Sequence, residues 1–230
     1  QVRPGGWQVG RALDLALASL LPPVAPGKIV GIGRNYREHA AELGNEMPTE
    51  PLIFLKSPGS VIGPRAPIVL PPESSQVEYE GEIAVVLRER LRRATPEQAA
   101  SAVLGITCAN DVTARDLQKK DKTFVRAKSI DTFCPLGPAI GLISDPEELR
   151  DLSVTTRVNG AERQRGSARE MAFGIADALA YISNYVTLEA GDVVLTGTPA
   201  GVGLLADGDV VEVECSGIGT LRNVVADEVA

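Results

Sequence analysis

The chain has 230 residues, of which 44% are hydrophobic, and its formal net charge is −7. This length and composition predict one globular domain with a core large enough to fold without covalent cross-links. The acidic balance, with no long basic run, excludes nucleic acid and membranes as expected partners, although a bound cation can still favour an anionic substrate by inverting the local field.

Residues 1–27 are predicted to be a lead-in segment, because the proline-rich stretch Leu21–Gly27 is typical of a linker. A single folded domain is expected over residues 28–230. Within it, short runs rich in β-branched residues predict strands, and Asn159 with Gly160 after one such run predicts a tight hairpin turn. The predicted strands cover residues 28–33, 51–56, 67–70, 77–87, 103–109, 154–158, 193–196 and 210–215.

Helices are predicted over residues 36–43, 96–103, 113–120 and 168–186. Thr95 and Gln98 form the capping-box pattern of the second helix, and Ser167 and Glu170 form that of the last. The last helix also carries one apolar stripe along its length. Many strands and few helices, without strict alternation, predict a mixed α/β, β-rich fold rather than a doubly wound sheet.

The three cysteines, Cys108, Cys134 and Cys215, are widely spaced and odd in number. They lack the paired spacing of a zinc site. We therefore expect reduced, mostly buried thiols in a cytoplasmic protein. The longest apolar stretch, Leu13–Val24, contains an aspartate and two prolines and is too short to span a bilayer.

The predicted strand 77–87 carries Glu78, Glu80 and Glu82 on one face, and the same face becomes apolar further along. A solvated acidic face would explain the glutamates but not the apolar residues that follow. No Lys or Arg shares this face, so a buried carboxylate here would need another partner, and a hard cation can supply it. The spacing alone favours these two interpretations equally. With one histidine and no cysteine pair, Mg²⁺ or Mn²⁺ is favoured over zinc.

Asp111 is the candidate for a third carboxylate ligand, because it lies between a predicted strand and a predicted helix. Taken alone, it is also typical of a helix N-cap. Arg115 and Gln118 follow three residues apart on the predicted helix, where surface ion pairs are the simpler interpretation.

Several segments together resemble the fumarylacetoacetate hydrolase family in order and spacing, over roughly residues 26–225. They are Gly33–His39, Glu80–Glu82, Asn110–Gln118, Ala127–Ser129 and Leu195–Gly203. The resemblance is to the compact single-domain branch, which contains 2-hydroxyhepta-2,4-diene-1,7-dioate isomerases, acylpyruvate hydrolases and oxaloacetate decarboxylases. It implies a mixed β-sandwich roll for the domain at 28–230 and a homodimer.

The resemblance also implies a set of site residues. One Mg²⁺ or Mn²⁺ per active site would be held by Glu80, Glu82 and Asp111. His39 and Glu42, on a mobile lid, would be the catalytic acid–base pair, and Lys128 would be a third catalytic residue. Residues that bind the substrate would be Arg115, Gln118, Thr198 and Tyr36.

On the sequence alone, a structural or surface role is the simpler interpretation of several of these residues. Lys128 fits a surface lysine, and Thr198 fits an ordinary glycine-rich turn that lacks the features of a phosphate-binding loop. His39, the only histidine, is consistent with a structural residue. Arg37, Arg65 and Lys56 are further cations that could contact a distal carboxylate of the substrate.

The expected function is that of a metal-dependent enzyme acting on small 2-oxo (di)carboxylic acids through a stabilised enolate. We expect the 2-hydroxyhepta-2,4-diene-1,7-dioate isomerase/decarboxylase type, in the breakdown of aromatic compounds. Acylpyruvate hydrolysis and oxaloacetate decarboxylation are alternatives, and a sugar-acid (2-keto-3-deoxy acid) hydrolase or dehydratase is a more distant one. A non-catalytic module that binds a metal or small ligand is the alternative from a different class.

Overall fold

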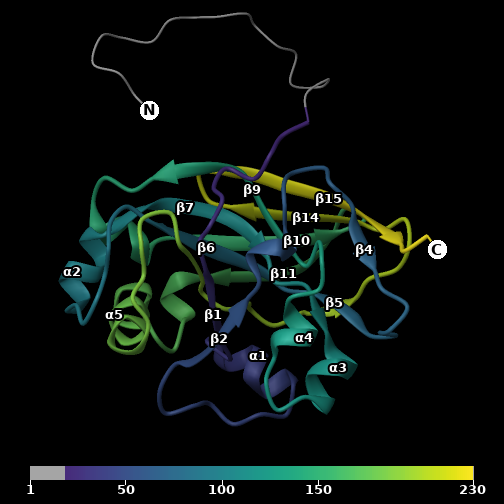
Figure 1. The fold of residues 1–230 in the computed structure, drawn as a ribbon, viewed down its shortest axis with the longest axis horizontal. Helices are drawn as coiled ribbons and strands as arrows, with labels where there is room; N and C mark the ends of the chain where they lie inside the picture. The colour runs from purple at the N-terminus through teal and green to yellow at the C-terminus, as the bar shows by residue number, and fades with distance from the viewer. Residues whose placement is uncertain (1–18, 230) are drawn as a thin grey trace, which may run out of the picture.

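The computed structural model describes residues 19–229, so most of the predicted lead-in segment lies outside the described residues (Figure 1). Its largest sheet has seven strands in the order β2-β1-β12-β6-β7-β9-β3. The β1–β12 and β3–β9 pairs are parallel and the other neighbours are antiparallel, so the sheet is mixed. Its strands are β1 (Ile29–Gly33), β2 (Leu52–Lys56), β3 (Val61–Ile62), β6 (Gly81–Leu87), β7 (Val103–Asn110), β9 (Cys134–Leu142) and β12 (Val193–Leu195).

A second sheet of five strands has the order β11-β10-β14-β15-β4. These strands are β4 (Ile68–Leu70), β10 (Ser153–Val158), β11 (Ala161–Ser167), β14 (Val210–Cys215) and β15 (Gly219–Asp227). A small sheet joins β13 (Gly203–Leu204), β5 (Val77–Tyr79) and β8 (Thr113–Ala114). The β10–β11 hairpin turns at Asn159 and Gly160, both with positive φ, as predicted from the sequence.

The two larger sheets pack face to face, which gives the β-rich sandwich-like roll that was expected. Ile83 and Cys108 from the first sheet share one core cluster with Val154 and Val213 from the second. The opposite face of β6 is also buried, because Ala84 packs in a separate apolar cluster. Burial on both faces makes β6 a rigid support for the residues at its start.

The helices of the described chain are short and lie around the sheets (Figure 1). They are α1 (Arg37–Glu42), α2 (Pro96–Ser101), α3 (Arg115–Lys120), α4 (Val125–Lys128) and α5 (Ile175–Tyr185), with 3₁₀ turns η1 (Pro58–Ser60), η2 (Pro146–Arg150) and η3 (Ala168–Glu170). The predicted capping box of α2 is present, since Thr95 and Gln98 bond each other's backbone.

The prediction of one helix over residues 168–186 is wrong. The capping box of Ser167 and Glu170 is present, but it caps only the turn η3, and α5 begins at Ile175. Between them the backbone is extended: Met171 pairs with Tyr36 in a β-bridge, and the next two backbone N–H groups donate to Asn35. These tertiary hydrogen bonds replace the helical ones that the apolar stripe favoured.

The predicted strand 77–87 is interrupted at Glu80, which separates β5 from β6. Six strands were not predicted. Three of them, β3, β8 and β13, have only two residues each; the others are β9, which contains glycines and prolines, and the more polar β11 and β15. The three cysteines are free and buried, as expected. No helix among residues 19–229 is long and apolar enough to cross a membrane.

Candidate active site

The interruption at Glu80 creates the turn on which the site is built. The Glu80 N–H donates to the Asn110 side chain at 2.9 Å, and the Asp111 N–H donates to the Glu80 carbonyl at 2.8 Å. Gly81 is required here, because a Cβ atom would collide with the side chain of Thr156. The turn between β5 and β6 is thereby fixed against the end of β7.

This arrangement gathers the three predicted carboxylates. Glu80 and Glu82 flank Gly81, and Asp111 follows directly after β7, which pairs with β6. One carboxylate oxygen from each of the three lies within 4.8 Å of the others, and all three side chains are buried. Three buried carboxylates with no cysteine or histidine among them are the donor set that suits a hard cation such as Mg²⁺ or Mn²⁺.

Three buried cations surround the carboxylates. Lys56 Nζ lies 2.6 Å from Asp111, and Lys128 Nζ contacts both Asp111 and, at 2.8 Å, Glu80. Arg115 bridges Glu80, at 2.5 Å, and Glu78, at 2.8 Å. Four buried acids therefore face three buried bases, and the set carries one excess negative charge.

The excess charge is concentrated at Glu82. Burial raises the pKa of Glu82, and the neighbouring Asp111 and Glu80 carboxylates raise it further, although Gly197 N–H donates to it at 2.6 Å. Burial would also raise the pKa of Glu80, but the positive charges of Lys128 and Arg115 outweigh it and hold that pKa well below its usual range. Glu82 is thus the carboxylate of the triad that most needs a further positive charge.

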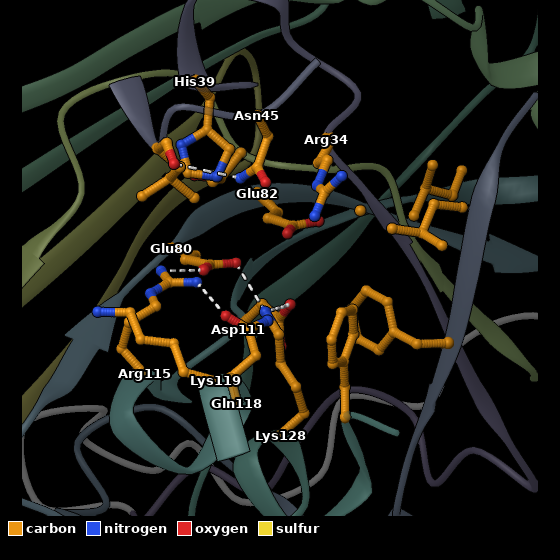
Figure 2. Close-up of a pocket in the computed structure, with 17 residues that line it drawn as sticks. Arg34, His39, Asn45, Glu80, Glu82, Asp111, Arg115, Gln118, Lys119 and Lys128 are labelled. Carbon is orange, nitrogen blue, oxygen red and sulfur yellow. Dashed lines mark hydrogen bonds and ion pairs between the residues drawn. The ribbon is translucent and has the colours of Figure 1, made fainter. Parts of the chain in front are cut away.

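A cavity of about 290 Å³ opens onto the triad (Figure 2). Its walls contain eight of the ten predicted site residues: His39, Glu80, Glu82, Asp111, Arg115, Gln118, Lys128 and Thr198. In Figure 2, His39 and Glu82 lie on one side of the cavity, and Arg115 and Gln118 lie on the other. The structure therefore brings residues from five separate segments of the chain to one place.

His39 and Glu42 contact each other from successive turns of α1. The imidazole Nδ1 lies 3.3 Å from the Glu42 carboxylate, which also accepts hydrogen bonds from the Gly201 N–H at 3.0 and 3.1 Å. Glu42 does not line the cavity but lies behind His39. Gly201 has a positive φ, and a Cβ atom there would collide with the carbonyl of Arg163. The glycine-rich loop therefore anchors Glu42, and Glu42 orients the imidazole.

Thr198 uses its hydroxyl to tie the glycine-rich loop to the carboxylate turn. It donates to the Gly81 carbonyl at 2.8 Å and accepts from Gln164 at 2.7 Å. Gln164 in turn accepts from the Gly81 N–H at 3.0 Å. On the opposite wall, Gln118 accepts from Arg115 at 2.7 Å and so helps to orient its guanidinium.

Tyr36 is the predicted site residue that the structure places in the core. It is 3% exposed, belongs to the main core cluster and is absent from the cavity wall. Burial and the charge of Glu82 raise its pKa, so its phenol stays protonated. Tyr36 was expected to bind the substrate, but its side chain is part of the core and not of the cavity wall.

The sequence pattern did not reveal two structural residues of the site, Lys56 and Gln164. Lys56 was expected only as a contact for a distal carboxylate, yet it is 2% exposed beneath Asp111. A lysine that ends the apolar run Leu52–Lys56 is the signal that was available. Gln164 lies in the polar strand β11, where nothing in the local pattern distinguishes it.

Known proteins resemble this chain over nearly all of its length. The family model for the fumarylacetoacetate (FAA) hydrolase C-terminal region matches residues 28–226. The crystal structure of a 5-carboxymethyl-2-hydroxymuconate delta-isomerase from Mycobacterium smegmatis is 43% identical, with a TM-score of 0.87, and the match covers 96% of this chain and 87% of that one. The structure of a 2-hydroxyhepta-2,4-diene-1,7-dioate isomerase from Mycobacterium marinum is 42% identical, with a TM-score of 0.86, over 96% and 82% of the two chains.

A curated relative points to related chemistry. The oxaloacetate tautomerase YisK of Bacillus subtilis is 45% identical in an alignment of 216 residues that covers 89% of this chain and 71% of that protein. These named relatives are enzymes that act on small organic acids. Together with the family match and the shared fold, they show that this chain is a member of the fumarylacetoacetate hydrolase family, in its compact branch.

Proposed function

We propose that this chain is a divalent-metal-dependent isomerase that interconverts the enol and keto forms of small 2-oxo dicarboxylates. The observation that carries the proposal is the buried triad of Glu80, Glu82 and Asp111 in one cavity with His39. Relatives named as isomerases and as an oxaloacetate tautomerase support this reaction class over hydrolysis and decarboxylation.

Glu80, Glu82 and Asp111 would hold the cation, Mg²⁺ or Mn²⁺. When bound, it supplies a Lewis acid that polarises the keto oxygen of a 2-oxo acid and stabilises negative charge there. The triad has the chemistry for this task, because hard oxygen donors suit these ions and three protein ligands leave room in an octahedral shell.

Lys128 and Arg115 would set the charge and geometry of the triad rather than exchange protons. Burial would lower the pKa of Lys128, but the Asp111 and Glu80 carboxylates outweigh it and raise that pKa, so the amine stays protonated. Arg115 is held between Glu78 and Glu80. Both cations keep Glu80 ionised, and each also faces the cavity, where its charge favours an anionic substrate.

His39 would move the proton. In the tautomer that donates from Nδ1 to Glu42, Nε2 would be the proton acceptor. In the ketonisation direction, the enol hydroxyl loses its proton and the conjugated carbon gains one; His39 would accept and return protons at these positions. The 4% exposure of His39 limits exchange of the proton with bulk water.

The test is a substrate panel with purified protein, followed by ultraviolet absorbance of the enol. Oxaloacetate, a 2-hydroxymuconate-type diene and acetylpyruvate are each assayed with Mg²⁺, with Mn²⁺ and with EDTA. We expect metal-dependent enol–keto conversion of a dicarboxylate, without release of carbon dioxide or acetate. Release of carbon dioxide would favour a decarboxylase, and release of acetate an acylpyruvate hydrolase. Binding of the metal without conversion of any compound would contradict an enzymatic role on these acids.

A further inference from the structure

Arg34 is a cation of the cavity wall that the proposed reaction does not use. It follows β1 directly, is half-buried, and in Figure 2 its guanidinium reaches into the cavity on the side of His39 and Glu82. Arg37, Arg65 and Lys56, the cations that the sequence suggested for a distal carboxylate, do not line this cavity. Arg34 occupies the position expected for one of them.

The backbone at Arg34 is held in an unusual conformation. Its φ is +57°, in the left-handed region that costs a non-glycine residue about 1 kcal/mol. Asn35, the next residue, fixes it: its side chain donates to the Thr196 and Phe173 carbonyls at 2.8 and 3.1 Å and accepts from the Phe173 N–H at 2.9 Å. A strained residue held this firmly next to a cavity indicates that the direction of its side chain matters.

The guanidinium of Arg34 has no carboxylate within ion-pairing distance in the described part of the chain. On the opposite wall, Arg115 contacts two. A guanidinium is planar and can donate two parallel hydrogen bonds to one carboxylate. These charge-assisted hydrogen bonds are strong, so a half-buried guanidinium without a carboxylate partner is well suited to bind one. The structure therefore presents an anion site in the same cavity as the triad.

The charges of the cavity call for two substrate carboxylates rather than one. The triad, Glu78 and the three buried bases together carry one net negative charge. A bound divalent cation would change this net charge to one positive charge. The carboxylate of a 2-oxo acid then neutralises this cluster. Arg34 is still without a partner, and a second carboxylate on the same molecule would pair with it.

Part of the cavity wall is apolar. Leu43, Leu52, Phe54 and Phe124 line the cavity together with the charged groups. Such a surface suits the hydrocarbon part of a short acid, whereas it would not satisfy the hydroxyl groups of a sugar acid. The cavity thus combines a carboxylate triad, apolar side chains and a guanidinium.

We propose that Arg34 binds the distal carboxylate of a 2-oxo dicarboxylate and so determines specificity for dicarboxylates over monocarboxylates. The inference rests on the proposed function, because it places the 2-oxo acid group at the triad. Lys119 is the other cation of the wall that is free of the acid cluster, but it is exposed and in Figure 2 lies on the far side, with Arg115 and Gln118. It provides a matched control for removal of one positive charge.

The test is calorimetric binding of matched ligands to the Mg²⁺-loaded full chain. The pairs are 2-oxoglutarate against 2-oxopentanoate, and 2-oxoadipate against 2-oxohexanoate, which differ only in the distal carboxylate. In the unmodified protein we expect the dicarboxylate of at least one pair to bind more tightly. Arg34→Met should weaken that dicarboxylate roughly 10- to 100-fold and leave its monocarboxylate unchanged. Lys119→Met should change both by less than about threefold.

Arg34→Asn provides a second variant that tolerates the left-handed backbone and should reproduce the effect if Arg34→Met misfolds. Three results would overturn the inference alone: no preference for dicarboxylates in the unmodified protein, equal weakening of both members of a pair by the Arg34 variants, or loss of the preference in Lys119→Met. Failure of the metal-loaded protein to bind any of the four acids would instead contradict the proposed function itself, and the inference with it.

Discussion

Two parts of the cavity wall are built differently. In one part, the buried carboxylates Glu80, Glu82 and Asp111 lie on or directly beside the paired strands β6 and β7 and form a charge cluster with the buried cations around them. The other part, the α1 segment, residues 34–45, consists of a strained arginine, a six-residue helix and a turn. Its contacts with the rest of the protein include the anchored side chains of Asn35 and Glu42 and the Tyr36 bridge.

The difference indicates that the two parts have different functions. Side chains that hold a cation must keep their geometry, and strands buried on both faces provide that rigidity. Side chains that exchange protons or select the substrate can lie on a shorter segment fixed at a few points, where opening costs little free energy. Substitutions in the charge cluster should therefore affect metal binding and folding, whereas substitutions in the α1 segment should affect turnover and specificity.

Glu82→Gln should have the strongest effect of all the substitutions. Its amide is isosteric with the protonated carboxyl that burial favours, so the melting temperature of the metal-free protein should not fall. Loss of a residue that only hydrogen-bonds to a metal ligand weakens metal binding by up to ~100-fold, and loss of the ligand Glu82 itself should weaken it more. Turnover should fall to the rate that the unmodified protein shows in EDTA. Calorimetric titration with Mn²⁺ measures the loss of metal affinity.

Glu80→Gln is the comparison variant. It should also destabilise the fold, because Arg115 and Lys128 would lose the charge of one buried ion-pair partner.

His39→Asn should reduce turnover by about 10²- to 10⁴-fold, the usual contribution of a positioned acid–base group. Because His39 belongs to the α1 segment, Mn²⁺ affinity and melting temperature should stay within error of the unmodified protein. A variant that turns over normally, or one that loses metal instead of rate, would contradict the different roles assigned to the charge cluster and the α1 segment.

Lys56→Met tests the contribution of the buried Lys56–Asp111 ion pair to stability. Removing one member of a buried ion pair costs about 3 kcal/mol of unfolding free energy or more, and here the remaining Asp111 keeps only one lysine partner. Urea denaturation measures the loss. Lys120→Met, an exposed lysine of α3, is the control and should change stability by less than about 0.5 kcal/mol. Equal stability of the two variants would show that Lys56 is not part of the cluster.

The pH dependence of stability should reveal Glu82. Its folded pKa is raised above its unfolded value, so its contribution to stability is present below the unfolded pKa and is lost as pH rises through the folded pKa. As pH rises above about 4.3, the ordinary pKa of a glutamate, EDTA-treated protein should therefore lose stability relative to Glu82→Gln, by at most about 1.4 kcal/mol for each rise of one pH unit. Mg²⁺ should reverse the loss. Parallel pH profiles of the two proteins would contradict the assignment.

Glu42→Gln should have the weakest effect, since it keeps the shape of the side chain and removes only the charge that orients His39. We expect a fall in turnover of about five- to tenfold, the value of one hydrogen bond. KM and Mn²⁺ affinity should not change, because Glu42 belongs neither to the cavity wall nor to the triad. A change in KM or Mn²⁺ affinity as large as the change in turnover would indicate a structural role for Glu42 instead.

Sequence patterns predicted the carboxylate triad of the cavity better than the residues that surround it. Strand alternation and the family resemblance placed Glu80, Glu82 and Asp111 together, because paired strands convert a local pattern into a shared face. The same alternation could not show the interruption at Glu80, which depends on hydrogen bonds to Asn110 and on close packing of Gly81 against Thr156.

Features that depend on distant partners were predicted least well. Lys56 and Arg115 reach the carboxylates from segments far from them in the sequence, and apart from the apolar run before Lys56 nothing local indicates these contacts. The long helix predicted over residues 168–186 failed because Asn35, far away in the sequence, takes the hydrogen bonds of its first turn. Tyr36 has the sequence position of a residue beside the cavity but the burial of a core residue.

A divalent cation on the triad and a proton moved by His39 beside it are the two essential parts of the proposed reaction. One experiment tests both: Mn²⁺ binding by electron paramagnetic resonance and enol–keto conversion of oxaloacetate, measured on the same samples of unmodified protein, Glu82→Gln and His39→Asn. We predict one bound Mn²⁺ and rapid conversion in the first, neither in the second, and bound Mn²⁺ without rapid conversion in the third. Full conversion by Glu82→Gln in the presence of EDTA would contradict the proposed role of the triad.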